Sequence, residues 1–288
     1  MEERDNKAEE FKRRVQSEWA GDGTAAAWQK YYPQMKAQLA LVTKAIVEAA
    51  DPKPGMSVLD LASGTGEPSI SLAARVVPGG HVTATDLSAG MLAALRFNAA
   101  QEGVTNMETK VCDCNGLSFA DACFDLVTSR FGVMFFAEID RALSEIKRVL
   151  KPGGRIAFLV WGAPAPGTYF GAAAMPYIRR LATKPDPDAP GPMRFAEPGK
   201  LAKLVEAAGF KAVRESVQTI PAPAQGTPEA FLAGMFEIAA PFRNAAATLS
   251  KNDRQAAEKE ALANLGALYD GNCINLNAPV IIITATAA

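Results

Sequence analysis

The segment Val58-Leu59-Asp60-Leu61-Ala62-Ser63-Gly64-Thr65-Gly66 decides the fold of this chain. Its first half is apolar enough for a buried strand, and its glycines let the backbone turn sharply into a helix and approach a ligand closely. Asp86 follows 22 residues after Gly64, at the end of a second apolar run. An acid at this spacing can accept hydrogen bonds from the hydroxyls of a ribose. The spacing therefore predicts a crevice that binds a nucleoside.

The composition indicates a compact protein that acts on small molecules. The chain has 288 residues, of which 49% are apolar, and this is enough for one large core and a cap. It has 30 basic and 31 acidic residues, so no basic surface favours nucleic acid or an anionic membrane. Residues 2–18 are charged and lack a signal peptide pattern, and the apolar run at 280–283 is too short to span a bilayer. We expect a cytoplasmic protein without membrane insertion.

Neither the cysteines nor the single histidine indicates a metal site. Four cysteines in a chain of this length do not form a disulfide framework, and we expect free thiols. Cys112 and Cys114 lack a second cysteine pair or a nearby histidine that would complete a tetrahedral set. His81 begins a predicted strand at the edge opposite the crevice, so we expect it to be structural or solvated.

Short apolar strands alternate with helical patterns along most of the chain. We expect a first helix around Phe11, Val15 and Trp19, and a second that ends before Asp51. The further predicted helices are 69–76, one that begins after Ser88, and 139–150. The predicted strands are 56–61, 81–85, 110–112, 124–129, 155–161, 211–220 and 279–285.

This alternation predicts an α/β fold with a doubly wound, seven-stranded, mainly parallel sheet of Rossmann-like type. Two long segments interrupt it, at about 163–195 and 221–277, and loops of this length are often lids or binding elements. We therefore expect an N-terminal helical cap at 1–50 and a Rossmann-like domain at 51–288 that carries these two lid insertions. Alternatively, the insertions are decorative or form an oligomer interface.

Over roughly residues 25–220 the chain resembles the class I S-adenosylmethionine-dependent methyltransferases, particularly the quinone-type and small-molecule enzymes. Five segments occur in the order of that family: 58–66, Asp86 within 84–88, Asp113 after the third strand, 124–132 and 149–154. Two departures are visible. Ala62 stands where many members have a glycine, and Cys112-Asp113-Cys114 replaces the usual Gly-Asp-Ala.

The resemblance implies a Rossmann-like methyltransferase fold and assigns roles to individual residues. The backbone of Ala62, Ser63, Gly64 and Gly66 would line the methionine portion and the ribose, and Asp86 would hold the ribose hydroxyls. Leu87 and Met91 would sandwich the adenine, Asp113 would accept from its amino group, and the amide of Cys114 would donate to a ring nitrogen. Ser129, Arg130 and Phe131 would flank the methionine end.

Structural roles remain open for several of these residues. Asp86 can cap a helix start, Met91 can be a core residue, and Asp113 can be a solvated turn acid. Arg130 can pair with an acidic group of the substrate, with the cofactor carboxylate, or only stabilise its loop.

Two other functions are compatible with part of the pattern. An NAD-dependent oxidoreductase would need a third glycine at position 69, which is Ser69, and Glu67 would place a negative charge where pyrophosphate binds. A non-catalytic S-adenosylmethionine-binding protein would keep the cofactor motifs but have no cavity beside the methyl group. The length of the insertions favours an enzyme.

Methyl transfer from a sulfonium requires alignment and the exclusion of water, and a base only if the acceptor must lose a proton. No histidine base is available, and the sequence does not choose among Tyr31, Tyr32, Tyr169, Tyr177 and Glu138. The apolar lid residues predict a small aromatic, quinone-like or lipid-like acceptor, although they can also be core; they are Phe170, Met175, Phe231, Met235 and Phe236. The methylated atom and the oligomeric state stay open.

Overall fold

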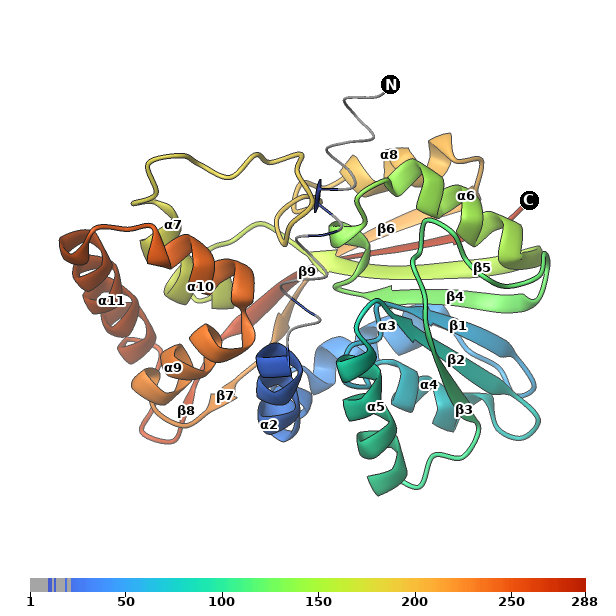
Figure 1. The fold of residues 1–288 in the computed structure, drawn as a ribbon, viewed down its shortest axis with the longest axis horizontal. Coiled ribbons are helices and arrows are strands. Elements are labelled where there is room, and N and C mark those ends of the chain that lie inside the picture. Colours follow the sequence, from blue (N-terminus) through green and yellow to red (C-terminus); the bar gives the residue numbers. More distant parts are fainter. Residues whose placement is uncertain (1–9, 12, 14–18, 20–21) are drawn as a thin grey trace.

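A computed structural model describes residues 10, 11, 13, 19 and 22–288 of the chain. The first helix expected around Phe11, Val15 and Trp19 falls mostly outside the described residues. Figure 1 shows two parts next to each other, a sheet flanked by helices and a mainly helical cap. The site lies where these two parts meet, so the elements that form each part are given first.

The sheet has seven strands in the order β3-β2-β1-β4-β5-β9-β6. Strands β1 to β5 pair in parallel, whereas β9 runs antiparallel to both of its neighbours, β5 and β6. This confirms the predicted seven-stranded, mainly parallel sheet. The strands are β1 (Ser57–Leu61), β2 (His81–Asp86), β3 (Met107–Val111), β4 (Phe124–Arg130), β5 (Leu150–Trp161), β6 (Lys211–Pro221) and β9 (Asn277–Thr286).

Helices cover both faces of the sheet because alternate residues of the central strands are apolar on either side. Leu59 packs in one core cluster with α6 (Ile139–Val149) and α8 (Lys200–Ala207). Val58 packs in another cluster with α3 (Ala40–Ala50) and α4 (Ser69–Val76). Helix α5 (Ala89–Gln101) packs beside α4 through Leu92 and Leu95. Residues 40–50, which we expected in the cap, therefore belong to the sheet layers.

Two strands differ from the sequence prediction. Strand β5 begins at Leu150, whereas we expected 151–154 to separate helix and strand. The register between β4 and β5 shifts at this point, and Ala287 exchanges hydrogen bonds with Gly153 and Gly154. These contacts hold the glycines in the sheet as a bulge. Strand β3 begins at Met107, three residues earlier than expected.

Both predicted insertions contribute to the cap. The first insertion contains η2 (Phe170–Ala174) and α7 (Met175–Ile178). The second contains β7 (Ala224–Gln225), α9 (Pro228–Ile238), α10 (Ala240–Ala247), α11 (Lys251–Gly266) and β8 (Cys273–Ile274). They share one apolar cluster, in which Tyr177 of the first insertion packs with Leu232 and Leu265 of the second.

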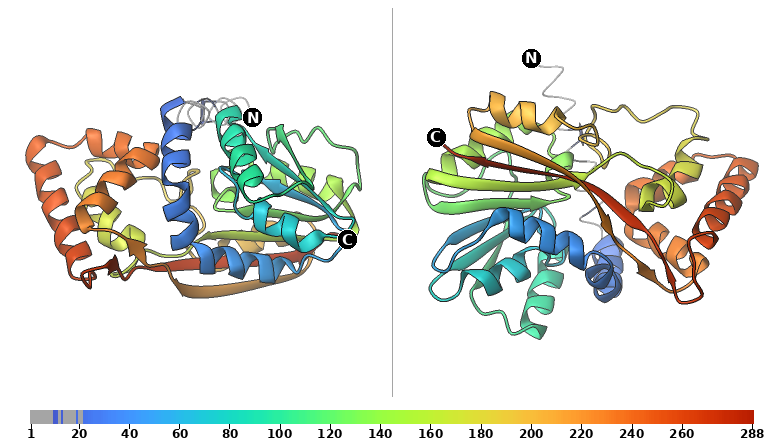
Figure 2. Two further views of the ribbon diagram at one scale, coloured as in Figure 1. Left: turned by 90° about the horizontal axis from the view of Figure 1, so that it is seen from below. Right: turned by 180° about the vertical axis from the view of Figure 1, so that it is seen from behind.

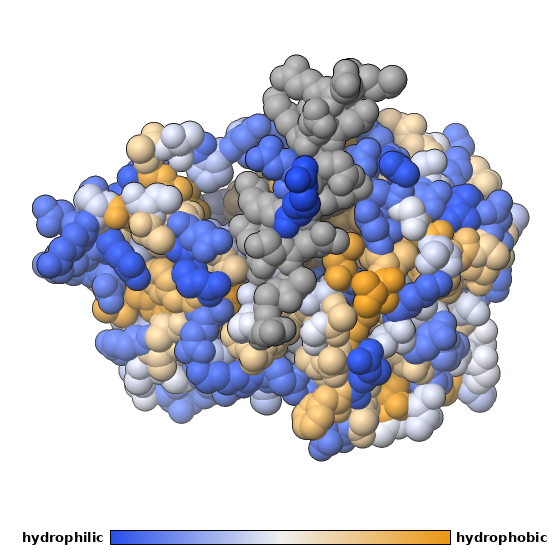
Figure 3. Space-filling view, viewed as in Figure 1, coloured by the Kyte–Doolittle hydropathy of each residue, from blue (hydrophilic) through white to orange (hydrophobic). Residues whose placement is uncertain are grey.

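The cap is continuous with the sheet and has a polar outer surface. The long strands β6 and β9 run out of the sheet toward the cap, as the view from behind in Figure 2 shows. Helix α11, at the left of the molecule, presents hydrophilic side chains to solvent (Figure 3). The buried residues of α11 face the apolar cluster of the cap; they are Ala257, Ala261 and Leu265.

Helix α2 (Asp22–Gln38) lies between the two parts (Figure 1). On the cap side, Trp28 Nε1 donates to the carbonyl of Ile238 at 2.8 Å, and Lys30 pairs with Glu237. On the sheet side, the Gln29 amide donates to Asn98 of α5 at 2.9 Å. No described helix is both long enough and apolar enough to cross a bilayer.

Candidate active site

The glycine-containing turn follows β1 at the carboxyl edge of the sheet. Ala62, Gly64 and Gly66 have φ values of 54°, 54° and 144°, a region that favours glycine. Ser63 fixes the turn, since its amide donates to the Thr85 carbonyl at 2.9 Å and its hydroxyl donates to the Asp60 carbonyl at 2.9 Å. Ala62 is exposed. The turn thus presents its backbone to the outside of the strand ends, where α/β sheets bind ligands.

The buried carboxylate of Asp60 connects the strand before this turn to two neighbouring elements. Asp60 in β1 is fully buried and accepts hydrogen bonds from Ser69 Oγ at 2.5 Å and Thr128 Oγ1 at 2.6 Å. Burial raises the pKa of Asp60 to about 6, and the hydrogen bonds from these hydroxyls oppose that rise. Asp60 therefore links β1, α4 and β4.

Asp86 ends β2 beside the turn. Its carboxylate accepts from the Gly64 amide at 3.0 Å and from the Ser88 amide at 2.9 Å. Desolvation raises the pKa of Asp86, although the side chain keeps part of its surface accessible. The carboxylate is thus surrounded by protein and still reachable, and its oxygens retain lone pairs for ribose hydroxyls.

The residues expected around an adenine follow the ends of β2 and β3. Leu87 is partly exposed, whereas Met91 is buried on the first turn of α5. Asp113 accepts from the Asn115 amide at 2.9 Å, and Cys114, next to it, is half-buried. The Cys112 amide donates to the Asp86 carbonyl at 3.1 Å, which brings the ends of β2 and β3 together. The geometry therefore places Leu87, Asp113 and Cys114 along one edge with Asp86.

The end of β4 closes the site beside the turn. Ser129 Oγ donates to the Leu61 carbonyl at 3.0 Å. A Cβ atom added to Gly132 would lie 2.5 Å from the Ala62 Cβ and 2.6 Å from Ser129 Oγ, so glycine is required for this approach. Phe131, the residue before Gly132, has a φ of 60°, and this left-handed backbone conformation is strained for a residue of its size. Such strain often marks a functional segment.

Arg130 carries a positive charge into the same region. Its Nη1 donates to Thr43 Oγ1 of α3 at 2.7 Å, while its buried Nε has no hydrogen-bond partner in the structure. Burial lowers the pKa of Arg130, and the charges of Glu67 and Asp60 oppose this effect. A buried guanidinium with an unused N–H group can donate a hydrogen bond to a carboxylate ligand.

Five aromatic rings extend from Phe131 into the cap, and we call them the aromatic platform. Phe131 stacks on Trp161 of β5 with ring centroids 3.8 Å apart, and Trp161 lies parallel to Tyr169 at 6.3 Å. Phe170 meets Trp161 and Tyr169 edge-on, at 5.3 and 5.0 Å. Phe231 of α9 meets Tyr169 edge-on at 5.7 Å. The platform therefore connects the glycine-containing turn with the cap.

The side chains considered as bases have different surroundings. Tyr31 donates to Glu237 at 2.9 Å on an exposed surface, and Tyr32 donates to Glu102 at 3.2 Å. Tyr177 is buried between Phe rings of the cap. Glu138 precedes α6 and lies 3.8 Å from Arg141, and Tyr169 belongs to the aromatic platform. His81 is the first residue of β2, at the opposite end from the turn.

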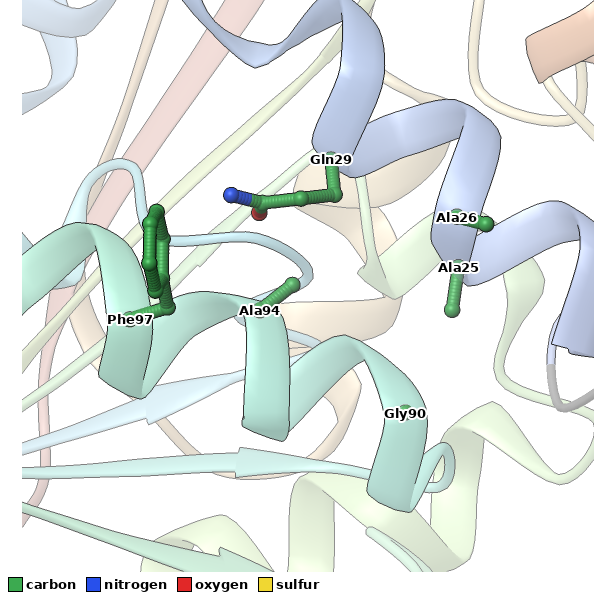
Figure 4. A pocket seen from close by; sticks show the side chains of 6 residues that line it. All are labelled: Ala25, Ala26, Gln29, Gly90, Ala94 and Phe97. Atoms are coloured by element: carbon green, nitrogen blue, oxygen red, sulfur yellow. The ribbon is translucent and has the colours of Figure 1, made fainter.

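A hollow lies between α2 and α5. It has a volume of about 300 Å³ and is lined by Ala25, Ala26, Gln29, Gly90, Ala94 and Phe97. Figure 4 shows the Gln29 side chain reaching from α2 toward the α5 side. The Asn98 amide donates in turn to the Thr65 carbonyl at 2.8 Å. The hollow thus lies behind a hydrogen-bond chain that connects α2 with the turn. Nowhere in the described part of the chain do three or more His, Cys, Asp or Glu side chains form a possible metal site.

Several residues of the site carry no sequence motif. Thr43 and Asn98 lie within helices, where a polar residue is usually solvated. Trp161 had a detectable signal, since it is an aromatic residue at the carboxyl end of a predicted parallel strand. The sequence alone gave no indication that Trp161 and Tyr169 lie parallel.

Residues 58–154 match the family model described as a methyltransferase domain. A ubiquinone/menaquinone biosynthesis C-methyltransferase UbiE of Bordetella avium is 41% identical over 126 residues, covering 43% of this chain and 49% of that protein. The UbiE of Ralstonia pickettii is 40% identical over 107 residues, covering 37% and 44%. The chain thus matches about half the length of these curated relatives.

Solved structures share the fold of the chain. The YcgJ protein from Bacillus subtilis superposes with a TM-score of 0.55 at 19% identity, covering 86% of this chain and 98% of that one. The phosphoethanolamine N-methyltransferase 2 of Haemonchus contortus, in complex with S-adenosyl-L-methionine, superposes with a TM-score of 0.56 at 19% identity, covering 96% and 59%. At these identities the likeness concerns the fold.

Proposed function

We propose that the chain is a class I S-adenosylmethionine-dependent methyltransferase acting on a small, apolar or aromatic acceptor, since its residues 58–154 match the methyltransferase domain model. The observation that carries the proposal is the 3.0 Å hydrogen bond between the Gly64 amide and the Asp86 carboxylate. It joins the glycine turn to an accessible acid at the carboxyl edge of the sheet.

The residues around the turn fit S-adenosylmethionine. Asp86 has acceptor capacity for the ribose hydroxyls, and the unpartnered Nε of Arg130 is suited to the carboxylate of the methionine portion. Asp113 and the amide of Cys114 are available for the adenine edge. When bound, the cofactor supplies an electrophilic methyl group on a sulfonium that is already a good leaving group.

A dinucleotide fits the turn less well. The buried Glu67 carboxylate accepts from Ser71 Oγ at 2.6 Å at the start of α4, where a pyrophosphate would need positive potential. Ser69 occupies the position of the third glycine, and its hydroxyl is bonded to Asp60. These contacts argue against an NAD-dependent oxidoreductase.

With the cofactor bound, the residues of the chain have to orient the acceptor and exclude water. The aromatic platform begins at Phe131, next to the turn, and continues into the cap through Phe231. A protein that only sensed the cofactor would not need an apolar surface beside the turn. The platform therefore favours an enzyme over a non-catalytic binding protein.

The first test is calorimetric titration of the purified protein with S-adenosylhomocysteine, with NAD as a parallel control. We expect micromolar binding of S-adenosylhomocysteine and no binding of NAD. Binding of NAD alone, or of neither ligand, would refute the proposed cofactor. If S-adenosylhomocysteine binds, transfer of a labelled methyl group from S-adenosylmethionine to a panel of small acceptors distinguishes an enzyme from a binding protein.

A further inference from the structure

Helix α2 presents three polar side chains to the second half of the glycine-containing turn. Gln29, Tyr32 and Lys36 are spaced by three and four residues, so they lie on one face of the helix. They reach residues 65–67 of the turn, either directly or through α5. One face of α2 therefore contacts three consecutive residues of the turn.

The first contact runs through Asn98, which is buried in α5. Gln29 Nε2 donates to Asn98 Oδ1 at 2.9 Å, and Asn98 Nδ2 donates to the Thr65 carbonyl at 2.8 Å. A reversed Asn98 amide would place its oxygen against the carbonyl oxygen of Thr65. The Gln29 donor thus stabilises the orientation in which Asn98 holds the turn.

The other two contacts involve Glu102, the residue that follows α5. The Tyr32 hydroxyl donates to Glu102 at 3.2 Å and lies 3.4 Å from the position that a Cβ atom on Gly66 would take. Lys36 forms ion pairs with Glu102 and, at 3.4 Å, with the buried carboxylate of Glu67. Burial, together with the charges of Glu67 and Glu102, raises the pKa of Tyr32, so its hydroxyl stays protonated and donates.

These contacts act on a part of the turn that has a flexible backbone. Gly64 and Gly66 have positive φ values, and glycine has the largest conformational freedom of any residue. Hydrogen bonds made by Ser63 and Gly64 fix the first half of the turn. The contacts from α2 and α5 add to them at residues 65–67. A turn that is ordered before a ligand arrives binds it more tightly, because less conformational entropy is lost on binding.

From this arrangement we propose that four side chains outside the turn are positioning residues of the cofactor site; they are Gln29, Tyr32, Lys36 and Asn98. They act through the turn, by holding residues 65–67 in the conformation that receives the cofactor. This inference rests on the proposed function and extends the same site to α2 and α5. It also gives Tyr32, one of the side chains considered as a base, a different role.

The alternative is that these side chains only fasten α2 to α5. Asn98→Leu keeps the size of the side chain and removes the donor to Thr65. Asn106→Leu is its matched control, because the Asn106 amide also donates to backbone carbonyls, those of Ala73 at 3.0 Å and Gly80 at 3.1 Å. Gly80 directly precedes β2, at the opposite edge of the sheet from the turn.

A second set of variants tests the ion pair at the turn. Lys36→Met removes the charge, whereas Lys36→Arg keeps it. Lys30→Met is the control on the same helix, since Lys30 pairs with Glu237 of α9 at 2.8 Å. This set decides the question even if Asn98→Leu does not fold, because the Lys36 side chain is 35% exposed.

The first measurement is hydrogen–deuterium exchange of residues 62–70 in the full chain without ligand. The amides of this segment include those of Gly66 and Ile70, which donate to the carbonyls of Ser63 and Gly66. We expect exchange about fivefold faster than in wild type in Asn98→Leu and Lys36→Met. Lys36→Arg and the two controls, Asn106→Leu and Lys30→Met, should exchange at the wild-type rate in this segment.

The second measurement is calorimetric titration of the same proteins with S-adenosylhomocysteine. We expect roughly tenfold weaker binding in Asn98→Leu and about threefold weaker binding in Lys36→Met. Lys36→Arg and both controls should bind as the wild type does.

The outcomes separate this inference from the proposed function. If the wild type does not bind S-adenosylhomocysteine, the proposed function fails and the inference fails with it. If the wild type binds, unchanged exchange in Asn98→Leu and Lys36→Met overturns only the inference. Faster exchange with unchanged affinity also overturns it, because the contacts then hold the turn without serving the cofactor. An equal loss of affinity in Asn106→Leu and Lys30→Met overturns it as well, since the effect then comes from general destabilisation.

Discussion

Replacement of Asp86 by alanine tests the centre of the proposed site. The carboxylate accepts from two backbone amides, those of Gly64 and Ser88, and so it both shapes the turn and presents acceptors to a ribose. The substitution should therefore lower two quantities, the affinity for S-adenosylhomocysteine and the free energy of unfolding. These effects have different sources and can be measured separately.

The expected loss of affinity is larger than that of one neutral hydrogen bond. Loss of charge-assisted hydrogen bonds to the ribose hydroxyls should cost about 2 kcal/mol, which corresponds to roughly a thirtyfold higher dissociation constant. The free energy of unfolding should fall by about 2 kcal/mol, since two amides lose their acceptor. Helix α5 keeps its own cap, because Ser88 Oγ still accepts from the Met91 amide at 3.2 Å.

Asp125→Ala is the matched control for this variant. Asp125 also accepts from a backbone amide, that of Ser57 at 2.8 Å, and pairs with Lys151 at 2.8 Å. It lies near the amino ends of β1 and β4, at the opposite edge of the sheet from the turn. Calorimetric titration and urea denaturation of both variants should show lower stability in each and lower affinity only in Asp86→Ala. Unchanged affinity in folded Asp86→Ala, or an equal loss in Asp125→Ala, would refute the ribose role.

Three further substitutions test the construction of the turn. Gly132→Ala should lower the free energy of unfolding by about 2 kcal/mol, because its Cβ would meet Ala62 and Ser129 at 2.5 and 2.6 Å. Gly116→Ala is the control, since the Cβ there meets no atom within 4 Å. Urea denaturation should show lower stability only in Gly132→Ala, and equal stabilities would contradict the packing argument. Ala62→Gly should raise the free energy of unfolding by about 0.5 kcal/mol, because glycine adopts the left-handed conformation at φ 54° without strain. The greater entropy of glycine in the unfolded chain offsets part of this gain. A lower melting temperature of the variant would contradict the prediction. Asp60→Asn should change the pH dependence of stability, because the folded pKa of about 6 lies above the ordinary 3.8 and the wild type loses stability as pH rises through this range. The variant's stability relative to wild type should therefore increase by about 2 kcal/mol from pH 4 to pH 7. A constant difference would contradict the raised pKa.

The sequence predicted the elements whose signals are local. Helix α4 begins at Ser69 and ends at Val76 as expected, and Ser88 caps α5. The predicted last strand at 279–285 is present as β9, which is the antiparallel member of the mainly parallel sheet. The start of β5 was wrong, because Gly153 and Gly154 are held in the sheet by Ala287, a residue more than a hundred positions away. A long-range pairing of this kind leaves no trace in local composition.

The candidate site was predictable where a motif marks it and not where packing forms it. Asp86 and the turn follow from spacing, and the structure places them within one hydrogen bond of each other. The hydrogen bond between Arg130 and Thr43 of α3 depends on the docking of a helix, which the sequence does not encode as a motif. The parallel arrangement of Trp161 and Tyr169 depends on the course of the first insertion. The ligand roles of these residues stay predictions.

The bridging position of α2 has a consequence for how the cap and the turn are connected. A cap that swings away from the sheet must break the contacts of α2 either with α9 or with α5. The α9 contacts include the exposed Lys30–Glu237 pair, which contributes little, whereas the α5 side contains the chain from Gln29 through the buried Asn98 to the turn. The α9 side also has the hydrogen bond from Trp28 Nε1 to the Ile238 carbonyl at 2.8 Å, so α2 is fastened on both sides. Any displacement of the cap would therefore pull on the helix that is hydrogen-bonded toward the turn, so the positions of the cap and the turn are coupled through α2.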